Sequence, residues 1–599
     1  MKGKMASILN NNLSDRGIRS ICMGGVLPMS RRQMDKLGWD ELDVLLVSGD
    51  AYIDHPSFGV ALLGRWLVMQ GLRVGIIAQP RWTGPDDLLA MGRPRLMAGV
   101  TAGAIDSMLA HYTAFRKKRS DDAYTPGGLA GSRPNRACIV YSGLVKQAFG
   151  KLPVVLGGIE ASLRRITHYD FWTDKLRRSV LLDAKADLLL YGMAERGILE
   201  TARRLKQGKP IACPEIPGSA YIGNPDDLPA GAEVIELPSH EEILADPGKL
   251  MAAALDLERH VHQARAYAVQ RVEGRSLILT PPCALTDEEM DRLYALPFTR
   301  RPHPGYKGRN IPAAEMIRFS ITTHRGCGGG CSFCTLAMHQ GRRICSRSTD
   351  SIVDEARSIA RQKGFTGSIS DVGGPTANMW GGECKADLDR RARCLRSSCL
   401  FPKICRNFAV DQDRLIELLD KVRSCKGVKH VRVSSGIRHD LALASPRYIS
   451  QMVRHYVGGQ LKIAPEHISD DVLRLMRKPG VGVFERFVDI FEAQCASAGK
   501  RQYVVPYLIS AFPGCTMQHM EQLADWLSKR SWWPRQVQCF IPLPGTVAAA
   551  MYYAGIDTSG RPIPVARTDS ERLKMHHVLL GQDRPGKPKR AGYRPGRGF

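Results

Sequence analysis

The sequence predicts an α/β protein in which an N-terminal Rossmann-like parallel sheet is followed by a partial (β/α) barrel. In the first half, short apolar runs rich in β-branched residues alternate with segments of helical length. In the second half the same alternation repeats about six times, which suits a partial barrel better than a second Rossmann sheet. The 599 residues suggest two to four domains. We divide them into an N-terminal domain (1–225), a connector (226–300), a barrel (301–560) and a basic tail (561–599) expected to be disordered.

The first half begins with a βαβ unit. Residues 43–50 (DVLLVSGD) and 73–78 (RVGIIA) are expected to be buried strands. Residues 60–70 (VALLGRWLVMQ) have helical length, and Gly71 follows where a helix often ends. Such a unit predicts parallel strands with helices on the faces of the sheet. Further strands are expected at 137–141, 153–156 and 186–191, and a helical stretch near 252–270.

The second half is more regular. The helix expected at 351–363 carries its apolar residues on one stripe, and the helix at 413–423 does the same. Further helices are expected at 446–457, 483–496 and 518–530. The strands that alternate with them are expected at 315–323, 367–372, 428–434, 459–463, 502–509 and 536–541.

Charge and cysteine content narrow the class of protein. A formal net charge of +26 suggests a polyanionic partner or substrate. No apolar signal segment precedes residue 46, and the uncharged stretch 536–556 is interrupted by Pro542, Pro544 and Gly545. We therefore expect a cytoplasmic protein with no membrane contact. Of its 16 cysteines, eight fall between Cys327 and Cys405, and in a reducing compartment they are expected to be ligands or buried thiols.

The sharpest motif is a C-x3-C-x2-C run formed by Cys327, Cys331 and Cys334. It follows the first expected barrel strand, and barrel active sites lie at the carboxyl ends of the strands. Three thiolates on a four-iron cluster leave one iron free. The alternative is a zinc site with His324 or His339 as fourth ligand. The position at a strand end favours iron–sulfur.

This run resembles the signature of radical S-adenosylmethionine (SAM) enzymes, whose three cysteines hold a [4Fe-4S] cluster and whose free iron chelates SAM. The resemblance implies that Phe333 lies beside the SAM adenine and that Gly373 and Gly374 contact its methionine amino group. Pro375 stands where many members have an acidic residue. Ser434, Ser435, Arg438, Glu466 and His467 end other strands and are candidate SAM or substrate contacts, or alternatively helix caps.

Longer strings resemble the YgiQ-type radical SAM proteins, a family of undefined substrate. They cover roughly residues 25–560 and include GDAYIDHPSFG, VLGGIEASLRR, LPFTRRPHP, SDVGGPTANM and LKIAPEH. The family usually has a bulky residue where Gly328 stands. The resemblance implies reductive cleavage of SAM, hydrogen abstraction from an unknown substrate, and a reductant such as flavodoxin or ferredoxin. The alternative is a non-radical iron–sulfur or zinc protein that binds nucleic acid through its basic surface.

The N-terminal sheet also resembles the cobalamin-binding domain that precedes the barrel in many radical SAM enzymes. The cobalt lower-ligand motif of such domains has one residue between Asp and His, whereas Asp54 and His55 are adjacent. Bound cobalamin is therefore the less favoured interpretation. We favour a Rossmann-like domain that covers the barrel and shapes the substrate site.

A second cysteine group lies in a loop of about forty residues between the strand ending at 372 and the helix beginning near 413. Loops of that length are normally functional or disordered. We expect this loop to bind a second metal, as an iron–sulfur cluster or zinc, and the alternative is ordinary surface thiols. The group consists of Cys384, Cys394, Cys399 and Cys405.

Overall fold

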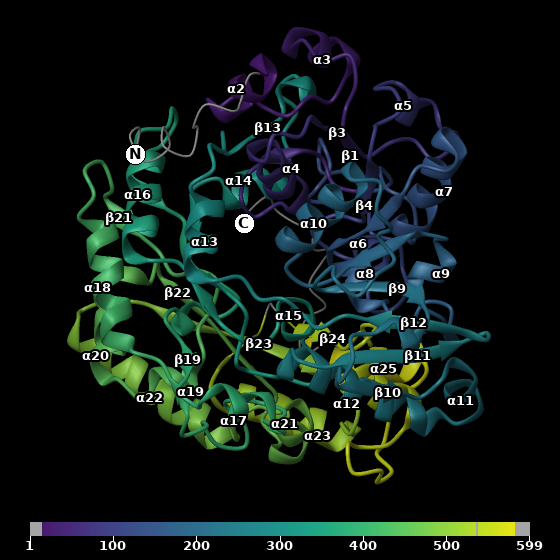
Figure 1. Ribbon diagram of the computed structural model, residues 1–599. Helices are drawn as coiled ribbons and strands as arrows, with labels where there is room; N and C mark the ends of the chain where they lie inside the picture. Colours follow the sequence, from purple (N-terminus) through teal and green to yellow (C-terminus); the bar gives the residue numbers. More distant parts are fainter. Residues whose placement is uncertain (1–14, 533, 535–536, 581–599) are drawn as a thin grey trace.

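The computed structural model describes residues 15–532, 534 and 537–580. Residues 581–599 of the expected tail lie outside the described residues. The described chain forms an N-terminal half and a second half that lie side by side (Figure 1). No helix in these ranges is long and apolar enough to cross a membrane.

The N-terminal half is built on one nine-stranded sheet. Its first five strands along the chain are parallel and lie in the order second, first, third, fourth, fifth. In a sheet of this order, the strand order reverses between the first and third strands, and ligands bind at the carboxyl ends of the strands there. These strands are β1 (Val44–Ser48), β3 (Val74–Ala78), β4 (Met97–Thr101), β5 (Val154–Leu156) and β8 (Leu188–Leu190).

One strand expected from the sequence is wrong. Residues 137–141 belong to helix α7 (Ala137–Phe149), and the third parallel strand is β4, which the sequence reading missed. The buried positions of α7 recur at helical spacing, so a five-residue apolar window did not separate helix from strand. Helix α4 (Gly59–Met69) lies where a helix was expected.

The segment 226–300 is more than a connector. Strands β10 (Val234–Leu237), β11 (Tyr267–Val272) and β12 (Arg275–Leu279) extend the N-terminal sheet. β12 pairs antiparallel with β9 (Ser219–Gly223), which pairs antiparallel with β8. Pairing with β9 gives the backbone groups of this segment their hydrogen-bond partners inside the sheet. Helix α12 (Pro247–Gln263) lies beside this extension.

The second half contains short parallel strands whose pairings run β14–β18, β17–β21, β22–β23 and β23–β24. Helices α16 (Thr349–Ala360), α18 (Gln412–Arg423), α20 (Pro446–Gln451) and α22 (Val481–Ser497) line its outer side (Figure 1). The strands are β14 (Ser320–Thr322), β17 (Ser368–Ile369), β18 (Asp371–Gly373), β21 (His430–Val431), β22 (Gln460–Glu466), β23 (Tyr503–Ser510) and β24 (Val537–Cys539).

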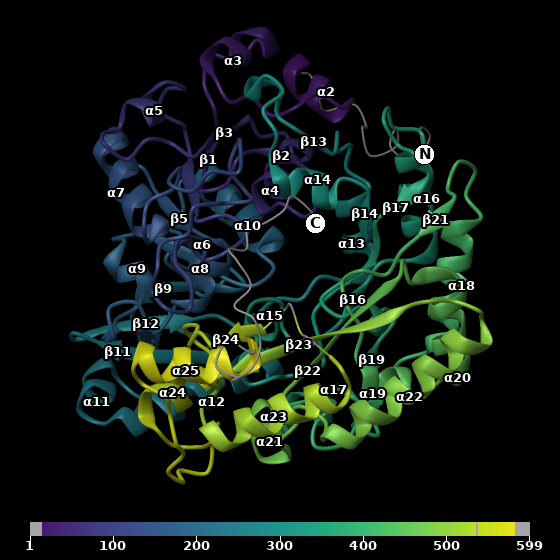
Figure 2. The ribbon, with the colours of Figure 1, turned by 180° about the vertical axis from the view of Figure 1, so that it is seen from behind.

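Two further expectations are corrected at the ends of this half. The strand expected at 315–323 is mostly helix α14 (Pro312–Ile317), which Pro312 begins, and only β14 is extended. Within the expected tail, residues 569–580 form helix α25 (Asp569–Leu580), which packs against α23 (Met517–Lys529) and β24. Helix α24 (Val547–Ala554) packs against α12, so the C-terminal elements return to the N-terminal half (Figure 2).

Candidate functional site

The cysteine loop lies between β15 (His324–Arg325) and α15 (Thr335–Gln340), and Cys334 caps that helix. Remote segments hold the loop in place. The Ser332 hydroxyl donates to the Leu475 carbonyl at 2.7 Å. The backbone carbonyl of Ser332 accepts from the Ala548 amide at 2.9 Å. The Arg477 guanidinium donates to the Gly330 carbonyl at 3.3 Å. Both α21 (Asp470–Met476) and α24 therefore fix the loop.

Glycines shape the loop between the thiols. A Cβ at Gly329 would lie 3.3 Å from Cys327 Sγ and 3.8 Å from Cys331 Sγ, so the two thiols flank this residue. The Gly329 amide donates to Cys327 Sγ at 3.4 Å. At Gly330, φ is +56° and a Cβ would lie 2.2 Å from the Ser397 carbonyl oxygen. The close wrapping of the loop therefore requires the absence of side chains at these positions.

The three cysteines are half-buried, and one fixed cation lies near their thiols. Burial raises the pKa of Cys327, and burial together with the two neighbouring thiols raises the pKa of Cys334 to about 12. Arg438 Nη1 lies 3.7 Å from Cys331 Sγ, and Asp440 holds this guanidinium through bonds of 2.9 and 2.6 Å. Ionised Cys327 and Cys334 therefore need more positive charge than Arg438 supplies, and a bound metal would provide it.

No three His, Cys, Asp or Glu side chains in the described ranges are arranged to hold a metal ion as they stand. The thiols would have to rotate to bind one. The two histidines weighed as zinc ligands contact hydroxyls: His324 Nδ1 lies 2.9 Å from Thr323 Oγ1, and His339 Nδ1 lies 2.9 Å from Ser162 Oγ. Burial lowers the pKa of both imidazoles to about 4, so both rings are neutral at pH 7.

The residues predicted to contact SAM come from neighbouring strand ends. A Cβ at Gly373 would lie 2.1 Å from Ser435 Oγ, and one at Gly374 would lie 2.6 Å from the His324 ring. The amides of Ser434 and Ser435 donate to Asp371 Oδ1 at 2.7 and 3.1 Å. Asp371 therefore joins β18 to the residues after β21. Sequence reasoning did not single it out, although it stands two residues before the glycine pair.

The remaining candidate residues lie in different settings. Arg438 lies beside the cysteine loop, as described above. Glu466 forms an ion pair with Lys478 at 3.5 Å. His467 accepts from the Ser469 amide at 3.0 Å and faces Cys515 Sγ at 3.7 Å, so it closes a turn. Phe333 packs edge-on against Phe512 with ring centroids 6.1 Å apart.

A cavity of about 530 Å³ lies where the two halves meet. Ser48, Thr101 and Gly157, at or just beyond the carboxyl ends of β1, β4 and β5, line one side. Gly373 and Gly374, with His324, line the other side. Gly373 and Gly374 thus share a cavity with the point of the N-terminal sheet at which the strand order reverses, whereas Phe333, Ser434 and Ser435 do not line it.

The second cysteine group packs directly on the cysteine loop. The Cys399 amide donates to the Gly328 carbonyl at 2.9 Å, and the Cys405 amide donates to the Cys399 carbonyl at 2.7 Å. A Cβ at Gly328 would lie 3.4 Å from Cys399 Cβ, which leaves little room for the bulky residue usual in this family. Burial raises the pKa of Cys399 to about 11, and the thiols of Cys384, Cys394 and Cys405 add to the effect. All four line one cavity of about 1370 Å³.

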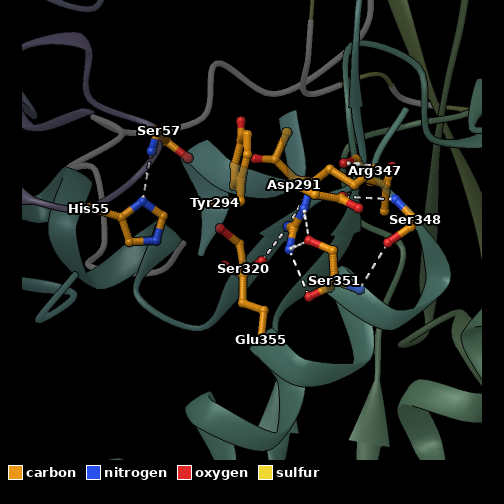
Figure 3. A network of polar contacts seen from close by, with 12 residues as sticks. His55, Ser57, Asp291, Tyr294, Ser320, Arg347, Ser348, Ser351 and Glu355 are labelled. Atoms are coloured by element: carbon orange, nitrogen blue, oxygen red, sulfur yellow. Dashed lines mark hydrogen bonds and ion pairs between the residues drawn. The ribbon is translucent and has the colours of Figure 1, made fainter. Parts of the chain in front are cut away.

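Asp54 and His55 belong to a polar network between the halves. Asp54 binds Arg65 through both oxygens, at 2.7 and 2.5 Å. His55 Nδ1 accepts from the Ser57 amide at 3.1 Å (Figure 3). Its Nε2 faces Arg300 at 2.9 Å. Arg300 also binds Glu355 of α16. Both ring nitrogens of His55 are engaged, so this pair offers no cobalt ligand as it stands.

Comparison with known proteins places this site in a family. The model described as Radical SAM N-terminal matches residues 26–320, and the model described as Radical SAM superfamily matches residues 321–527. The chain belongs to the radical SAM superfamily. It is therefore an enzyme, and the N-terminal match includes the segment 226–300 whose strands extend the first sheet.

Relatives define the family more narrowly. A UPF0313 protein of Geobacter sulfurreducens is 51% identical over 560 residues, which cover 92% of each chain. A UPF0313 protein of Rhodopseudomonas palustris is 50% identical over 553 residues, or 89% of this chain and 82% of that protein. The predicted membership of the YgiQ-type (UPF0313) radical SAM family is confirmed.

Two solved structures are similar over most of the chain. The radical SAM methyltransferase TsrM from Kitasatospora setae, with tryptophan and a SAM analogue bound, has a TM-score of 0.49 and 14% identity, covering 90% of this chain and 88% of that one. The cobalamin-dependent radical SAM enzyme OxsB has a TM-score of 0.47 and 10% identity, covering 96% and 61%.

Proposed function

We propose that this enzyme holds a [4Fe-4S] cluster through Cys327, Cys331 and Cys334 and cleaves SAM to begin hydrogen abstraction from a substrate. The observation that carries the proposal is the cysteine loop itself, where two thiols flank Gly329 beside the fixed cation of Arg438. When bound, the reduced cluster supplies the electron that splits SAM into methionine and a 5′-deoxyadenosyl radical.

The side chains around the loop have separate tasks in this proposal. Arg438 offsets negative charge at Cys331, and the Gly329 amide stabilises the Cys327 thiolate by a hydrogen bond. Gly373 and Gly374 leave backbone free of side chains for the methionine end of SAM. Asp371 fixes the Ser434–Ser435 backbone next to them.

The same proposal covers the arrangement of the halves. The parallel strands from β14 to β24 would form a partial barrel, with the N-terminal sheet covering its carboxyl ends. The cavity of about 530 Å³ between them would then hold the reacting part of the substrate, shielded from water. Its position at the reversal point of the sheet supports this role. A cobalamin-binding role for the N-terminal half is less favoured, because His55 has no free nitrogen.

The deciding experiment is SAM cleavage by the full chain. Anaerobically reconstituted protein, reduced with flavodoxin or ferredoxin, should release 5′-deoxyadenosine. Alanine at Cys327, Cys331 or Cys334 should abolish release, because losing one of three thiolates removes an iron ligand. Cys283→Ala, a similarly half-buried thiol remote from the loop, is the matched control and should retain it.

Two results would contradict the proposal. Wild-type release by any one of the three variants would show that its cysteine is not a ligand. If the iron-loaded protein can be reduced but never releases 5′-deoxyadenosine, the alternative of a non-radical metal protein would be favoured.

A second metal site is the finer part of the cofactor proposal. The four cysteines of the second group line one cavity and pack on the cysteine loop through Cys399 and Gly328, which supports a shared ligand set. Metal analysis of the Cys327/Cys331/Cys334→Ala triple variant tests it. Retained iron supports an auxiliary cluster and retained zinc a structural site, whereas an empty protein would show that the four are ordinary thiols.

A further inference from the structure

The cavity beside the second cysteine group is strongly basic. Its walls come from residues 286–288, 342–348 and 380–414, with His262 adding to them. Nine arginines and one lysine line it, against four acidic residues. Its volume of about 1370 Å³ exceeds the roughly 300–1000 Å³ of most small-molecule pockets. None of these cations has a role in the SAM site described above.

Most of these cations lack an acidic ion-pair partner among the described residues. Arg347 pairs with Glu355, but no other basic side chain of the wall forms an ion pair with a described residue. Arg342 is only 6% exposed, and its Nε and Nη1 atoms have no hydrogen-bond partner in the described part of the chain. A buried guanidinium without partners is unfavourable, because burial removes its hydration and no protein group replaces it. The cavity is therefore built to receive negative charge.

A metal held by the second cysteine group would not account for this charge. Cys394 and Cys399 lie near enough to Arg342 to interact with its charge, so thiolates there would neutralise that one side chain. Arg343, Arg390 and Arg406 are exposed on the walls and bind no carboxylate. The surplus cations remain after any metal is bound.

The aromatic residues of the wall indicate what kind of anion fits. Trp380 donates its indole N–H to the Arg347 carbonyl at 2.8 Å, and Arg414 covers its ring at 5.0 Å. Phe408 packs on Gly328, whose Cβ would lie 3.0 Å from its ring. Trp380 is only 1% exposed and Gly328 covers part of the Phe408 ring, so the aromatic residues offer little surface for a stacked base. Recognition must then act through charge, and guanidinium forks match phosphate oxygens.

We propose that this basic cavity binds several phosphate groups of one extended ligand, either a nucleoside polyphosphate or an RNA backbone. Calling this ligand the substrate rests on the proposed function, whereas the binding itself does not. Through Cys399 and Phe408 the cavity wall contacts Gly328 of the cysteine loop. Phosphate held there would supply binding energy away from the reacting atom and position that atom for the radical.

The test measures binding to the full reconstituted chain without SAM. The probes are tripolyphosphate, a short single-stranded RNA, and citrate as a phosphate-free polyanion. The cavity variant Arg343→Gln/Arg406→Gln is compared with Arg32→Gln/Arg361→Gln, which removes equal charge from exposed arginines elsewhere. Because hydrogen bonds to charged groups contribute about 1.5–3 kcal/mol, the cavity variant should weaken phosphate binding by roughly tenfold or more. The control should change it less than about twofold.

The probes separate the two sources of phosphate. Tripolyphosphate that competes with RNA for the cavity supports a nucleoside polyphosphate, and RNA that binds alone, with affinity falling steeply as salt rises, supports a nucleic-acid backbone. Equal weakening by both variants, or citrate binding as tightly as tripolyphosphate, would overturn the proposal. If the cavity variant fails to fold, the same binding test is made with Arg390→Gln/Arg393→Gln. Arg390 lies in helix α17 (Leu388–Ala392) and Arg393 is its C-cap residue. Loss of SAM cleavage with intact phosphate binding would refute the proposed function alone.

Discussion

Replacing Asp440 with asparagine should destabilise the protein and expose how the cysteine loop is held. The side chains of Arg438 and Asp440 are only 6% and 8% exposed, and two bonds of 2.9 and 2.6 Å join them. Burial raises the pKa of Asp440, but the charge of Arg438 outweighs burial and lowers it to about 2. Asp440→Asn leaves Arg438 charged and buried without its carboxylate hydrogen-bond partner, although Cys331 still lies 3.7 Å from its Nη1 atom.

The size of the effect follows from the pKa and from burial. A pKa lowered from 3.8 to about 2 corresponds to about 2 kcal/mol of folding free energy. Because the pKa is depressed, this stability is fully present above the unfolded value and is lost as the pH falls from about 4 toward 2. Removing one partner of a buried pair costs more, about 3–5 kcal/mol, since the other charge stays buried. For a second half of about 250 residues that unfolds as one unit, this cost should lower the midpoint of thermal unfolding at pH 7 by roughly 6–10 °C.

The assay is thermal unfolding of apo-protein followed by circular dichroism at pH 7. Asp413→Asn is the matched control, because Asp413 pairs with Arg447 at 3.5 Å on the surface and its loss should cost less than about 1 kcal/mol. The double variant Arg438→Met/Asp440→Leu should be more stable than Asp440→Asn, since it leaves no buried charge. A shift no larger than that of the control would refute the reasoning.

Two further predictions concern the contact between the halves and the SAM site. Glu355→Gln should lower the unfolding midpoint by several degrees, because it leaves Arg300 and Arg347 buried without a counter-ion, and an unchanged midpoint in a thermal melt would contradict this. Gly374→Ala should weaken SAM binding about tenfold or more with the fold intact, because the new Cβ displaces the His324 ring 2.6 Å away. Equilibrium dialysis with labelled SAM measures it, and wild-type affinity would show that Gly374 lies outside the SAM site.

The sequence was sufficient where the signal is local. Cys327, Cys331 and Cys334 lie within eight residues, so their spacing alone places three thiols on one short loop. Helix α16 was readable from the period of its apolar stripe, and β1 from a continuous apolar run. Long strings shared with the YgiQ-type proteins identified the family without any knowledge of the fold.

The sequence failed where the decision depends on remote partners. Residues 137–141 form a helix because α7 packs along the sheet, and a window of five apolar residues carries no period long enough to show that. Strands β10, β11 and β12 exist because β9 offers an open edge for pairing, which no local pattern in 226–300 reveals.

The sequence by itself determined the family, the three thiols and the overall basic charge. Only the tertiary structure decided which charges are paired. It placed Arg438 beside Cys331, 107 residues earlier in the chain, and gave it Asp440 as counter-ion. It also gathered unpaired arginines around one cavity while pairing Arg347 with Glu355. The net charge is a sum over the whole sequence and does not depend on the fold. Ion pairing depends on distances of a few ångströms, which are set by packing between segments that are distant in the sequence.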